Sequence, residues 1–434
     1  MILNLIFGLL ALLSLALTLW QWLVGRRFPL HQRTPESSRP NPRPSVTLLK
    51  PLKGCDPATE DCLRSWFAQQ HAGPTQLLFG VAAVEDPVCG IVRKLLEEFP
   101  GVEAQLVVAN SLPGANAKVA KLAELERVAK HDLLVISDAD VRVPSDFLVN
   151  LVAPLCDGLR YESEISGAGA RPCGLVCCFY RLANPTTVAM QWEAVAINAD
   201  FWSQVLQSRN LKPLDFALGA VMAIRRQQLQ EIGGFAALAD CLADDYQLGN
   251  RIARRGYSIA ISPVVVECWS APMGWAAVWK HQLRWARTIR VCRPVPYFFS
   301  ILSNATLWPL LWLALKPASS VAACAVVCWL VRILTALNLQ QRLSQNLDRG
   351  GRASPRARTF PENSAREHTR PPAAQPPRQA PQTQVPTPWR YAWLVPVKDL
   401  LQAAIWLLAF MGNGIEWRGE WMRLRRDGTL VRRP

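Results

Sequence analysis

The chain begins with a long apolar run. Residues 2–24 (ILNLIFGLLALLSLALTLWQWLV) contain no charged side chain, and as a helix they would extend about 35 Å, enough to cross a hydrocarbon core of roughly 30 Å. A cleavable signal peptide would have a basic start and a shorter apolar stretch, whereas this run follows Met1 directly and ends at Gly25-Arg26-Arg27. The pattern favours a membrane anchor over residues 1–25, and the arginines after it predict that the following domain is cytoplasmic.

Three more apolar segments occur late in the chain. They lie at 297–315, at 321–337 and near 395–415. We expect membrane segments within 297–337 and 391–434, and a disordered linker at 338–390, because that stretch is rich in Pro, Gln, Arg and Ser. The linker and the basic C-terminal tail both favour the cytoplasm. Either one late segment is therefore re-entrant or interfacial, or the charge rule fails locally.

Between the anchors, short apolar runs alternate with amphipathic stretches. Runs of strand length lie at 45–52, 76–84, 104–109 and 132–139. Helical periodicity follows at 89–100 and 117–131. This alternation predicts an α/β domain over about 45–270, with a mostly parallel sheet covered by helices on both faces. Ligands are then expected at the carboxyl ends of the strands.

Composition narrows the class of protein. The 434 residues are 50% hydrophobic and carry a formal net charge of +15, which excludes a disordered acidic chain, a collagen-like fibre and a small disulfide scaffold. Basic residues gather beside the apolar segments and in the linker, so we expect contact with anionic lipid headgroups and no nucleic-acid partner. Cys173, Cys177 and Cys178 lack the spacing of a zinc site, which indicates reduced thiols.

Carboxylates follow the predicted strands. Asp138 and Asp140 end the fourth strand, and Asp244-Asp245 lies at a later transition from loop to helix. An Asp-x-Asp at a strand end can present two hard oxygen ligands to a divalent cation that a diphosphate also holds. The alternative is a turn in which the Asp side chains cap backbone groups.

Two basic stretches complete the candidate chemistry. Asn116 and Lys118 precede a predicted helix in GANAK, where a small-residue turn and a cation suit a phosphate or ribose. The alternative there is an N-cap followed by a solvated lysine. Within a predicted interfacial region at 271–296, residues 280–287 (KHQLRWAR) combine cations with an aromatic ring, which is also typical of a snorkelling helix at a membrane surface.

These motifs resemble a known family. The set comprises LLKPLKGCDP (48–57), EDP (85–87), GANAKVAKL (114–122), SDADVRV (137–143), FALGAVMAIRR (216–226), GGF (233–235), ADDY (243–246) and HQLRW (281–285). In this order, between flanking apolar helices, it is similar to ceramide glucosyltransferases. LADDYQLG (242–249) and the ending WRGEWMRLRRDGTL (417–430) look most like the bacterial hopanoid-biosynthesis glycosyltransferases. The resemblance covers residues 1–337 and 391–434.

The resemblance implies a GT-A nucleotide-diphospho-sugar transferase that inverts the configuration at C1 of the transferred sugar. By position, Asp86 is expected near the uridine, Asp138 and Asp140 at a Mg²⁺ or Mn²⁺ ion that bridges to the UDP diphosphate, and Asp245 as the general base. The expected site residues are Asp244, Asp245, Arg284 and Trp285 in catalysis, Asp138 and Asp140 as metal ligands, and Glu85, Asp86, Asn116, Lys118, Asp138, His281 and Gln282 in substrate binding. The chain departs from the family pattern at Ala83, Lys121 and His281, which leaves donor recognition open.

The function expected from this resemblance is transfer of one sugar from a UDP-sugar to a lipid hydroxyl. The preferred pair is N-acetylglucosamine and a hopanoid polyol, with UDP-glucose and ceramide as the second choice. A processive polysaccharide synthase would be a different kind of enzyme with the same Arg-Trp motif, and a catalytically inactive scaffold would bind lipid or nucleotide without turnover. The protein is expected to cross the bacterial inner membrane several times, with its catalytic domain in the cytoplasm.

Overall fold

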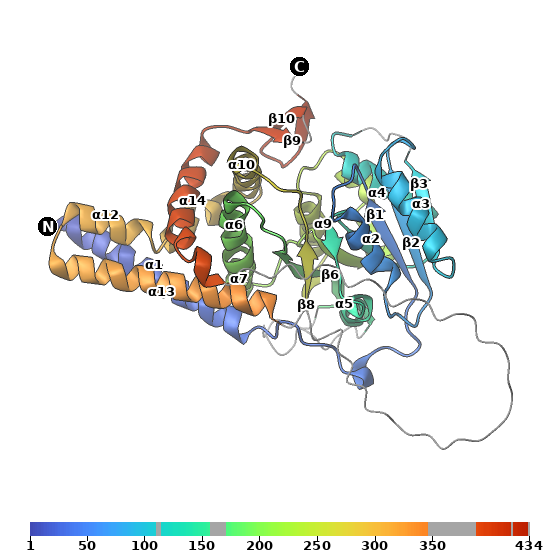
Figure 1. Cartoon of the computed structure of the whole chain (residues 1–434), viewed down its shortest axis with the longest axis horizontal. Helices are drawn as coiled ribbons and strands as arrows, with labels where there is room; N and C mark the ends of the chain where they lie inside the picture. The colour runs from blue at the N-terminus through green and yellow to red at the C-terminus, as the bar shows by residue number, and fades with distance from the viewer. Residues whose placement is uncertain (110–113, 157–170, 346–387, 418–419, 433–434) are drawn as a thin grey trace.

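An eight-stranded mixed sheet lies at the centre of the α/β region between the apolar helices (Figure 1). The computed structural model describes residues 1–109, 114–156, 171–345, 388–417 and 420–432. The strands are β1 (Val46–Pro51), β2 (Thr75–Val81), β3 (Glu103–Val108), β4 (Leu133–Ser137), β5 (Val141–Arg142), β6 (Cys173–Leu182), β7 (Val221–Arg225) and β8 (Ser258–Cys268). Their order is β3-β2-β1-β4-β7-β6-β8-β5. The first four confirm the strands expected from the sequence, within a few residues at each end.

Strand β7 and the edge strand β5 run opposite to the other six strands of the sheet. The pairs β1–β2, β2–β3, β1–β4 and β6–β8 are parallel, and β4–β7, β6–β7 and β5–β8 are antiparallel. Strands β1 and β4 are buried along their whole length, which explains their continuous apolar sequence. The carboxyl end of β4 therefore lies beside the start of β7, where a site can form between the two halves of the sheet.

Helices cover both faces of the sheet. One face packs against α2 (Thr59–Phe67), α3 (Val88–Glu98) and α5 (Phe147–Cys156), and the other against α4 (Ala117–Val128), α6 (Val188–Val195), η2 (Ala196–Phe201), α7 (Trp202–Leu211), α8 (Arg226–Glu231) and α9 (Asp244–Arg254). Neighbouring residues of β1 illustrate the two layers, because Leu48 belongs to one core cluster and Leu49 to the other. This arrangement confirms the expected α/β class.

Apolar helices extend away from the sheet (Figure 1). Helices α1 (Ile2–Arg27) and α13 (Ser319–Ser344) are long and apolar enough to cross a membrane. Helix α11 (Pro294–Phe299) with η4 (Ser300–Ser303) and α12 (Leu307–Leu315) form a bent pair at 57°, which would be a third span or a re-entrant loop. These candidate spans support a membrane protein.

The late segments differ from the expected pattern. Helix α13 continues through Leu339 and Leu343, both buried, and so includes the start of the stretch expected to be a linker; residues 346–387 of that stretch lie outside the described part of the chain. Helix α14 (Leu394–Phe410) is not among the candidate spans, and in Figure 1 it runs across the direction of α1 and α13. The side of the membrane on which the tail lies stays a prediction.

A small second sheet follows α14. It contains β9 (Gly414–Trp417), β10 (Glu420–Leu424) and β11 (Leu430–Arg432) in the order β11-β10-β9. Ile415, Met422, Leu424 and Leu430 form its buried side. That side packs against Leu242 and against α10 (Trp275–Cys292), so the last part of the chain returns to the catalytic region.

Candidate active site

The Asp138-Ala139-Asp140 turn lies between β4 and β5, at the carboxyl end of β4. Its backbone is fixed on both sides, because Asp138 N donates to Ala220 O at 3.2 Å and Trp269 N donates to Asp140 O at 3.0 Å. Burial and the neighbouring charge of Asp138 raise the pKa of Asp140 to about 6. Two carboxylates held so close together favour a cation between or beside them.

Lys118 supplies one such cation. Its Nζ lies 2.8 Å from Asp138 Oδ1 and 3.0 Å from Asp244 Oδ2. Burial alone would lower the pKa of Lys118, but the charges of Asp138 and Asp244 raise it well above its usual value. The lysine thus joins the turn after β4 to the acidic start of α9, and the structure brings together three residues that were expected to share a site.

Asn116 holds Lys118 in place. Its Oδ1 accepts hydrogen bonds from Lys118 N at 3.0 Å and Val119 N, and its Nδ2 donates to Cys241 O at 2.8 Å. The side chain is fully buried and caps α4. Its polar groups are therefore occupied by backbone partners, which agrees with an N-cap role rather than with direct substrate binding.

Asp245 points toward the loop before β7. A Cβ atom built on Gly219 would lie 2.6 Å from Asp245 Oδ2, and Asp245 Oδ1 accepts a hydrogen bond from Tyr246 N at 2.7 Å. Helix α9 can approach that loop because Gly249 has no side chain, since a Cβ there would lie 2.3 Å from Ala217 N. Burial and the charge of Asp244 raise the pKa of Asp245 to about 6, a value suited to a general base near neutral pH.

The contact at Gly219 gives a first prediction. Gly219→Ala will push the Asp245 carboxylate out of position and lower the turnover number by about 10²-fold, because small displacements of a catalytic group are costly. The thermal unfolding temperature will change little. The matched control is Gly90→Ala on α3, where a Cβ meets nothing within 4 Å. Equal activities of the two variants would contradict the placement of Asp245.

Lys50 is a site residue that the sequence analysis missed. It lies on β1, fully buried, and its Nζ donates to Ser137 Oγ at 3.1 Å and to the Asp138 carbonyl at 2.5 Å. Burial lowers its pKa to about 8, although the charges of Asp140 and Asp138 act in the opposite direction. A lysine inside an otherwise apolar strand was the available signal, since a buried ammonium requires nearby acceptors.

The HQLRW residues lie on α10 and meet α6. His281 Nδ1 lies 2.7 Å from Glu193 Oε1, and Gln282 Nε2 donates to the same oxygen at 2.9 Å. The Trp285 ring lies 4.7 Å from the His281 ring, between centroids, and Arg284 lies half-buried one residue before it. Glu193, which the sequence did not single out, therefore orients the start of this motif.

Glu85 and Asp86 lie in the loop between β2 and α3. Asp86 accepts hydrogen bonds from Gly54 N at 2.9 Å and from Val88 N at 3.1 Å, so its carboxylate ties the loop after β1 to the start of α3. Glu85 is exposed. The contacts at Asp86 are those of a turn cap, and a nucleotide role for either residue stays a prediction.

The C-terminal sheet closes the region on another side. Leu430 N donates to Asp240 O at 2.7 Å, and Leu242 N donates to Gly428 O at 3.3 Å. Asp240 Oδ1 in turn accepts from Ala115 N at 3.0 Å. The segment just before Asp244 is thus held between the turn that precedes α4 and the last hairpin of the chain.

The residues present suit a divalent cation with a diphosphate. Within the part of the chain that the structure describes, no group of three or more His, Cys, Asp or Glu side chains could hold a metal ion. Asp138 and Asp140 offer two carboxylates, and hard cations such as Mg²⁺ take their remaining ligands from water and phosphate oxygens. The arrangement fits an ion that arrives with a phosphorylated substrate.

Comparison with known proteins identifies the family. The model of glycosyl transferase family 21 matches residues 6–349 and 374–430, including both the catalytic region and the C-terminal sheet. The chain belongs to glycosyl transferase family 21. The family 21 match confirms the resemblance drawn from the ordered motifs, at the level of ceramide glucosyltransferase-like proteins.

Individual relatives of this family 21 chain match it over only part of its length. It is 34% identical to a ceramide glucosyltransferase of Candida albicans over 157 residues, which cover 34% of this chain and 28% of that protein. It is 23% identical to ceramide glucosyltransferase 3 of Caenorhabditis elegans over 240 residues, covering 54% of this chain and 48% of that one. The matched part therefore spans less than half the length of these curated relatives.

The solved structures that are similar to the family 21 chain have low sequence identity to it. A mannosyltransferase of Pyrobaculum calidifontis, in complex with GDP-Man and Mn²⁺, is 21% identical with a TM-score of 0.49, covering 79% of this chain and 96% of that one. A glucosyl-3-phosphoglycerate synthase of Mycobacterium tuberculosis, with Mn²⁺, UDP and phosphoglyceric acid, is 18% identical with a TM-score of 0.32, covering 56% and 78%. Family membership rests on the matched residues rather than on these overall likenesses.

Proposed function

We propose that this protein is a membrane-bound, inverting GT-A glycosyltransferase that transfers one hexose from a UDP-sugar to a lipid hydroxyl. The observation that carries the proposal is the Lys118 ammonium, which joins Asp138 after β4 to Asp244 beside Asp245. Groups suited to donor binding and to proton removal thus lie within one small region of a family 21 chain.

The proposed chemistry assigns a role to each group. The lipid hydroxyl oxygen attacks C1 of the sugar, the bond from C1 to the UDP oxygen breaks, and Asp245 accepts the hydroxyl proton. Asp138 and Asp140 would hold a divalent cation, which would neutralise part of the charge on the departing diphosphate. Arg284 is suited to further phosphate contacts because its guanidinium is always charged, and Lys118 because its carboxylate partners raise its pKa.

The apolar helices support a lipid acceptor. Trp285 of the HQLRW motif contacts Phe201 with ring centroids 6.1 Å apart, and Phe201 ends η2, which packs against α13. The HQLRW motif is thus connected to the candidate membrane span α13 through Phe201 of η2. Arg26 and Arg342 lie at the ends of α1 and α13 nearest the sheet, where Arg342 Nη2 donates a hydrogen bond to Arg26 O at 2.9 Å. Positive charges at these helix ends support a catalytic domain on the cytoplasmic side of the membrane. In a bacterium this would be the inner membrane.

The relatives favour one donor and acceptor pair. Their names make ceramide and UDP-glucose the better supported pair, whereas the expected transfer of N-acetylglucosamine to a hopanoid polyol has no support from the comparisons. We therefore propose glucosylceramide as the product. The hopanoid product stays a prediction from the resemblance of 242–249 and 417–430.

A polysaccharide synthase and an inactive scaffold have weaker support. A processive polysaccharide synthase needs several helices after HQLRW to form an export channel, but the described residues contain one candidate span there, or two with the bent pair. An inactive scaffold would not require the acidic residues, and Asp138, Asp140 and Asp245 are all present at one site.

A lipid product assay tests the proposal. The purified protein in liposomes with Mn²⁺ receives UDP-glucose or UDP-N-acetylglucosamine, each with ceramide or a hopanoid polyol, and mass spectrometry identifies the product. Hexosylceramide supports the proposed pair, and a glycosylated hopanoid would replace ceramide with the hopanoid polyol as the acceptor. Release of UDP without any glycolipid, or no reaction at all, would overturn lipid transfer.

A further inference from the structure

The last part of the chain is attached to the rest at two distant places. We call α14 and the sheet β9–β11 (residues 394–432) the C-terminal arm. One end of the arm lies against the candidate spans, and the other end contacts α10 and the segment that precedes Asp244. The way in which the first end is attached is not used by the proposed chemistry.

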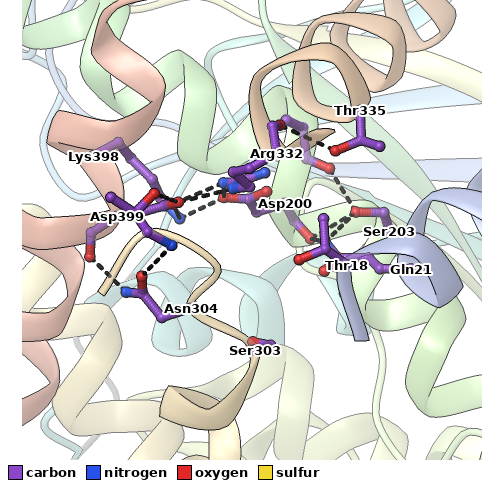
Figure 2. A network of polar contacts seen from close by, with 12 residues as sticks. Thr18, Gln21, Asp200, Ser203, Ser303, Asn304, Arg332, Thr335, Lys398 and Asp399 are labelled. Atoms are coloured by element: carbon purple, nitrogen blue, oxygen red, sulfur yellow. Dashed lines mark hydrogen bonds and ion pairs between the residues drawn. The ribbon is translucent and has the colours of Figure 1, made fainter. Parts of the chain in front are cut away.

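A buried cluster of four charges makes that attachment (Figure 2). Arg332 on α13 lies 2.8 Å from Asp200 on η2 and 2.8 Å from Asp399 on α14, both measured from Nη2 to carboxylate oxygens. Its Nε donates to Asp399 Oδ2 at 2.9 Å, and Lys398 pairs with Asp200. We call Asp200, Arg332, Lys398 and Asp399 the charge quartet.

The quartet is buried, and its charges balance. Its four side chains are 5% to 7% exposed, and two positive charges balance two negative charges. Asp399 is also bound by the loop between the two parts of the bent pair, because Thr306 Oγ1 donates to Asp399 Oδ2 at 2.7 Å and Asn304 Nδ2 donates to Asp399 O at 2.7 Å. Three helical segments and one loop therefore meet at these charges, as Figure 2 shows.

Such a cluster specifies geometry more than it adds stability. Apolar residues of the same size would pack as well, but a buried charge without its partner is strongly unfavourable. Arg332 and Asp399 are 67 positions apart in the chain, so the backbone alone does not fix their alignment. A shift of α14 by one turn, about 5.4 Å, would separate Lys398 and Asp399 from both partners.

The other end of the arm contacts catalytic segments. Lys280 Nζ on α10 lies 2.7 Å from Glu416 Oε2 on β9, and Arg287 donates to Gly414 O. The hairpin between β10 and β11 bonds to residues 240 and 242, just before the acidic start of α9. Any shift of the arm would therefore be transmitted to α10 and to the segment that positions Asp245.

The charge quartet is also connected to the HQLRW motif through η2. Asp200 lies in η2, a π-helix, and the next residue, Phe201, contacts both Tyr180 and Trp285 with ring centroids 5.4 Å and 6.1 Å apart. The wider turns of a π-helix are often found at functional sites. Consecutive residues of η2 thus belong to the quartet and to the contacts of HQLRW.

We propose that the charge quartet sets the register of the C-terminal arm and thereby positions α10 and the segment before Asp245. Its members are positioning residues, which act through the arm and through Phe201. The catalytic consequence rests on the proposed function, whereas the register itself does not. The two can be measured separately.

Cross-linking reports the register directly. A water-soluble carbodiimide converts a paired carboxylate and ammonium into an amide, so Lys280 and Glu416 of the full-length protein in nanodiscs will yield a cross-linked peptide. The pair Lys130 and Glu103, which connects the end of α4 to β3, is the internal reference. In Asp399→Asn the Lys280–Glu416 product will fall by roughly tenfold, while the reference product stays constant.

A second variant separates register from folding. Arg332→Met with Asp399→Leu removes one charge of each sign and avoids an unpaired buried charge. Lys398 and Asp200 remain, but a lysine on its flexible stem does not fix a helix as the arginine fork does. This protein will fold and bind UDP normally, yet its Lys280–Glu416 product and its sugar transfer will both fall. Glu60→Gln, which breaks the ion pairs of Glu60 with Arg64 on α2 and with Lys94 on α3, will change neither.

The outcomes are distinct. If the double variant gives as much Lys280–Glu416 product as the wild-type protein, the proposal that the quartet sets the register is wrong. If the product is lost but sugar transfer is unchanged, the proposed effect of the register on catalysis is wrong. If the wild-type protein cross-links but transfers no sugar, the proposed function fails, while the cross-link comparison still decides the register.

Discussion

Asp245→Asn will reduce sugar transfer by about 10²- to 10⁴-fold, the usual contribution of a general base. The amide cannot accept the hydroxyl proton, but it keeps the shape of the carboxylate and the hydrogen bond from Tyr246 N. UDP binding and thermal unfolding will therefore stay close to those of the wild-type protein. Steady-state transfer assays and calorimetric titration with UDP measure the two effects.

The control for this change is Asp61→Asn, an exposed position on α2, which will leave transfer unchanged. The wild-type pH profile gives a further check. The pKa of Asp245 is raised to about 6, so the base is ionised above that pH and protonated below it. Transfer will fall as the pH decreases through about 6, where Asp140 also has a raised pKa, and Asp245→Asn will lack the part of that fall that is due to Asp245. Full activity in the variant would exclude Asp245 as the base.

Replacing Asp138 and Asp140 together with Asn will remove the metal dependence of UDP binding and lower transfer by about a thousandfold, because a metal ion contributes several kcal/mol of charge stabilisation. Calorimetric titration of UDP with and without Mn²⁺ will show the loss. The pKa of Asp140 is raised by burial and by the charge of Asp138, so removal of both charges also relieves repulsion. The change also takes a carboxylate partner from the buried Lys118 ammonium and leaves buried Lys50 without its neighbouring negative charges, so we expect the variant to unfold at a lower temperature than the wild-type protein.

The matched control is Glu124→Gln with Glu97→Gln, two acidic positions on α4 and α3 outside the site. This pair also removes two negative charges and will keep the response to Mn²⁺. A double variant at Asp138 and Asp140 that still binds UDP more tightly with Mn²⁺ would show that the ion binds elsewhere.

Much of the fold could be predicted from local patterns. Buried parallel strands such as β1 have a continuous apolar sequence, and acidic residues at their carboxyl ends identify the side of the sheet that carries the site. This reasoning predicted Asp138 and Asp140, whereas Asp244 and Asp245 were expected from the ADDY motif at a transition from loop to helix. It also found Lys118, because a cation after a small-residue turn is a feature of the local sequence.

The rest depends on contacts between distant segments. Gly219 and Glu193 matter because of what faces them, Asp245 and His281 respectively, and no spacing rule reveals such partners. Asn116 and Asp86 match family motifs, yet their side chains are occupied by backbone groups. Periodicity likewise predicted an apolar segment near 395–415, but it did not show that the strand β9 begins at Gly414 or that the last residues return to the site.

The position of Lys50 affects the protein between turnovers. Its ammonium contacts the turn after β4 from inside the sheet, and Lys118 binds Asp138 from the other side. When the nucleotide and its ion leave, the two acidic side chains remain next to these resident cations rather than facing only each other. The fold thus contains its own counterions, which limit the electrostatic cost of the site when it is empty; under the proposed function, this would keep the site in a stable conformation until the next donor binds.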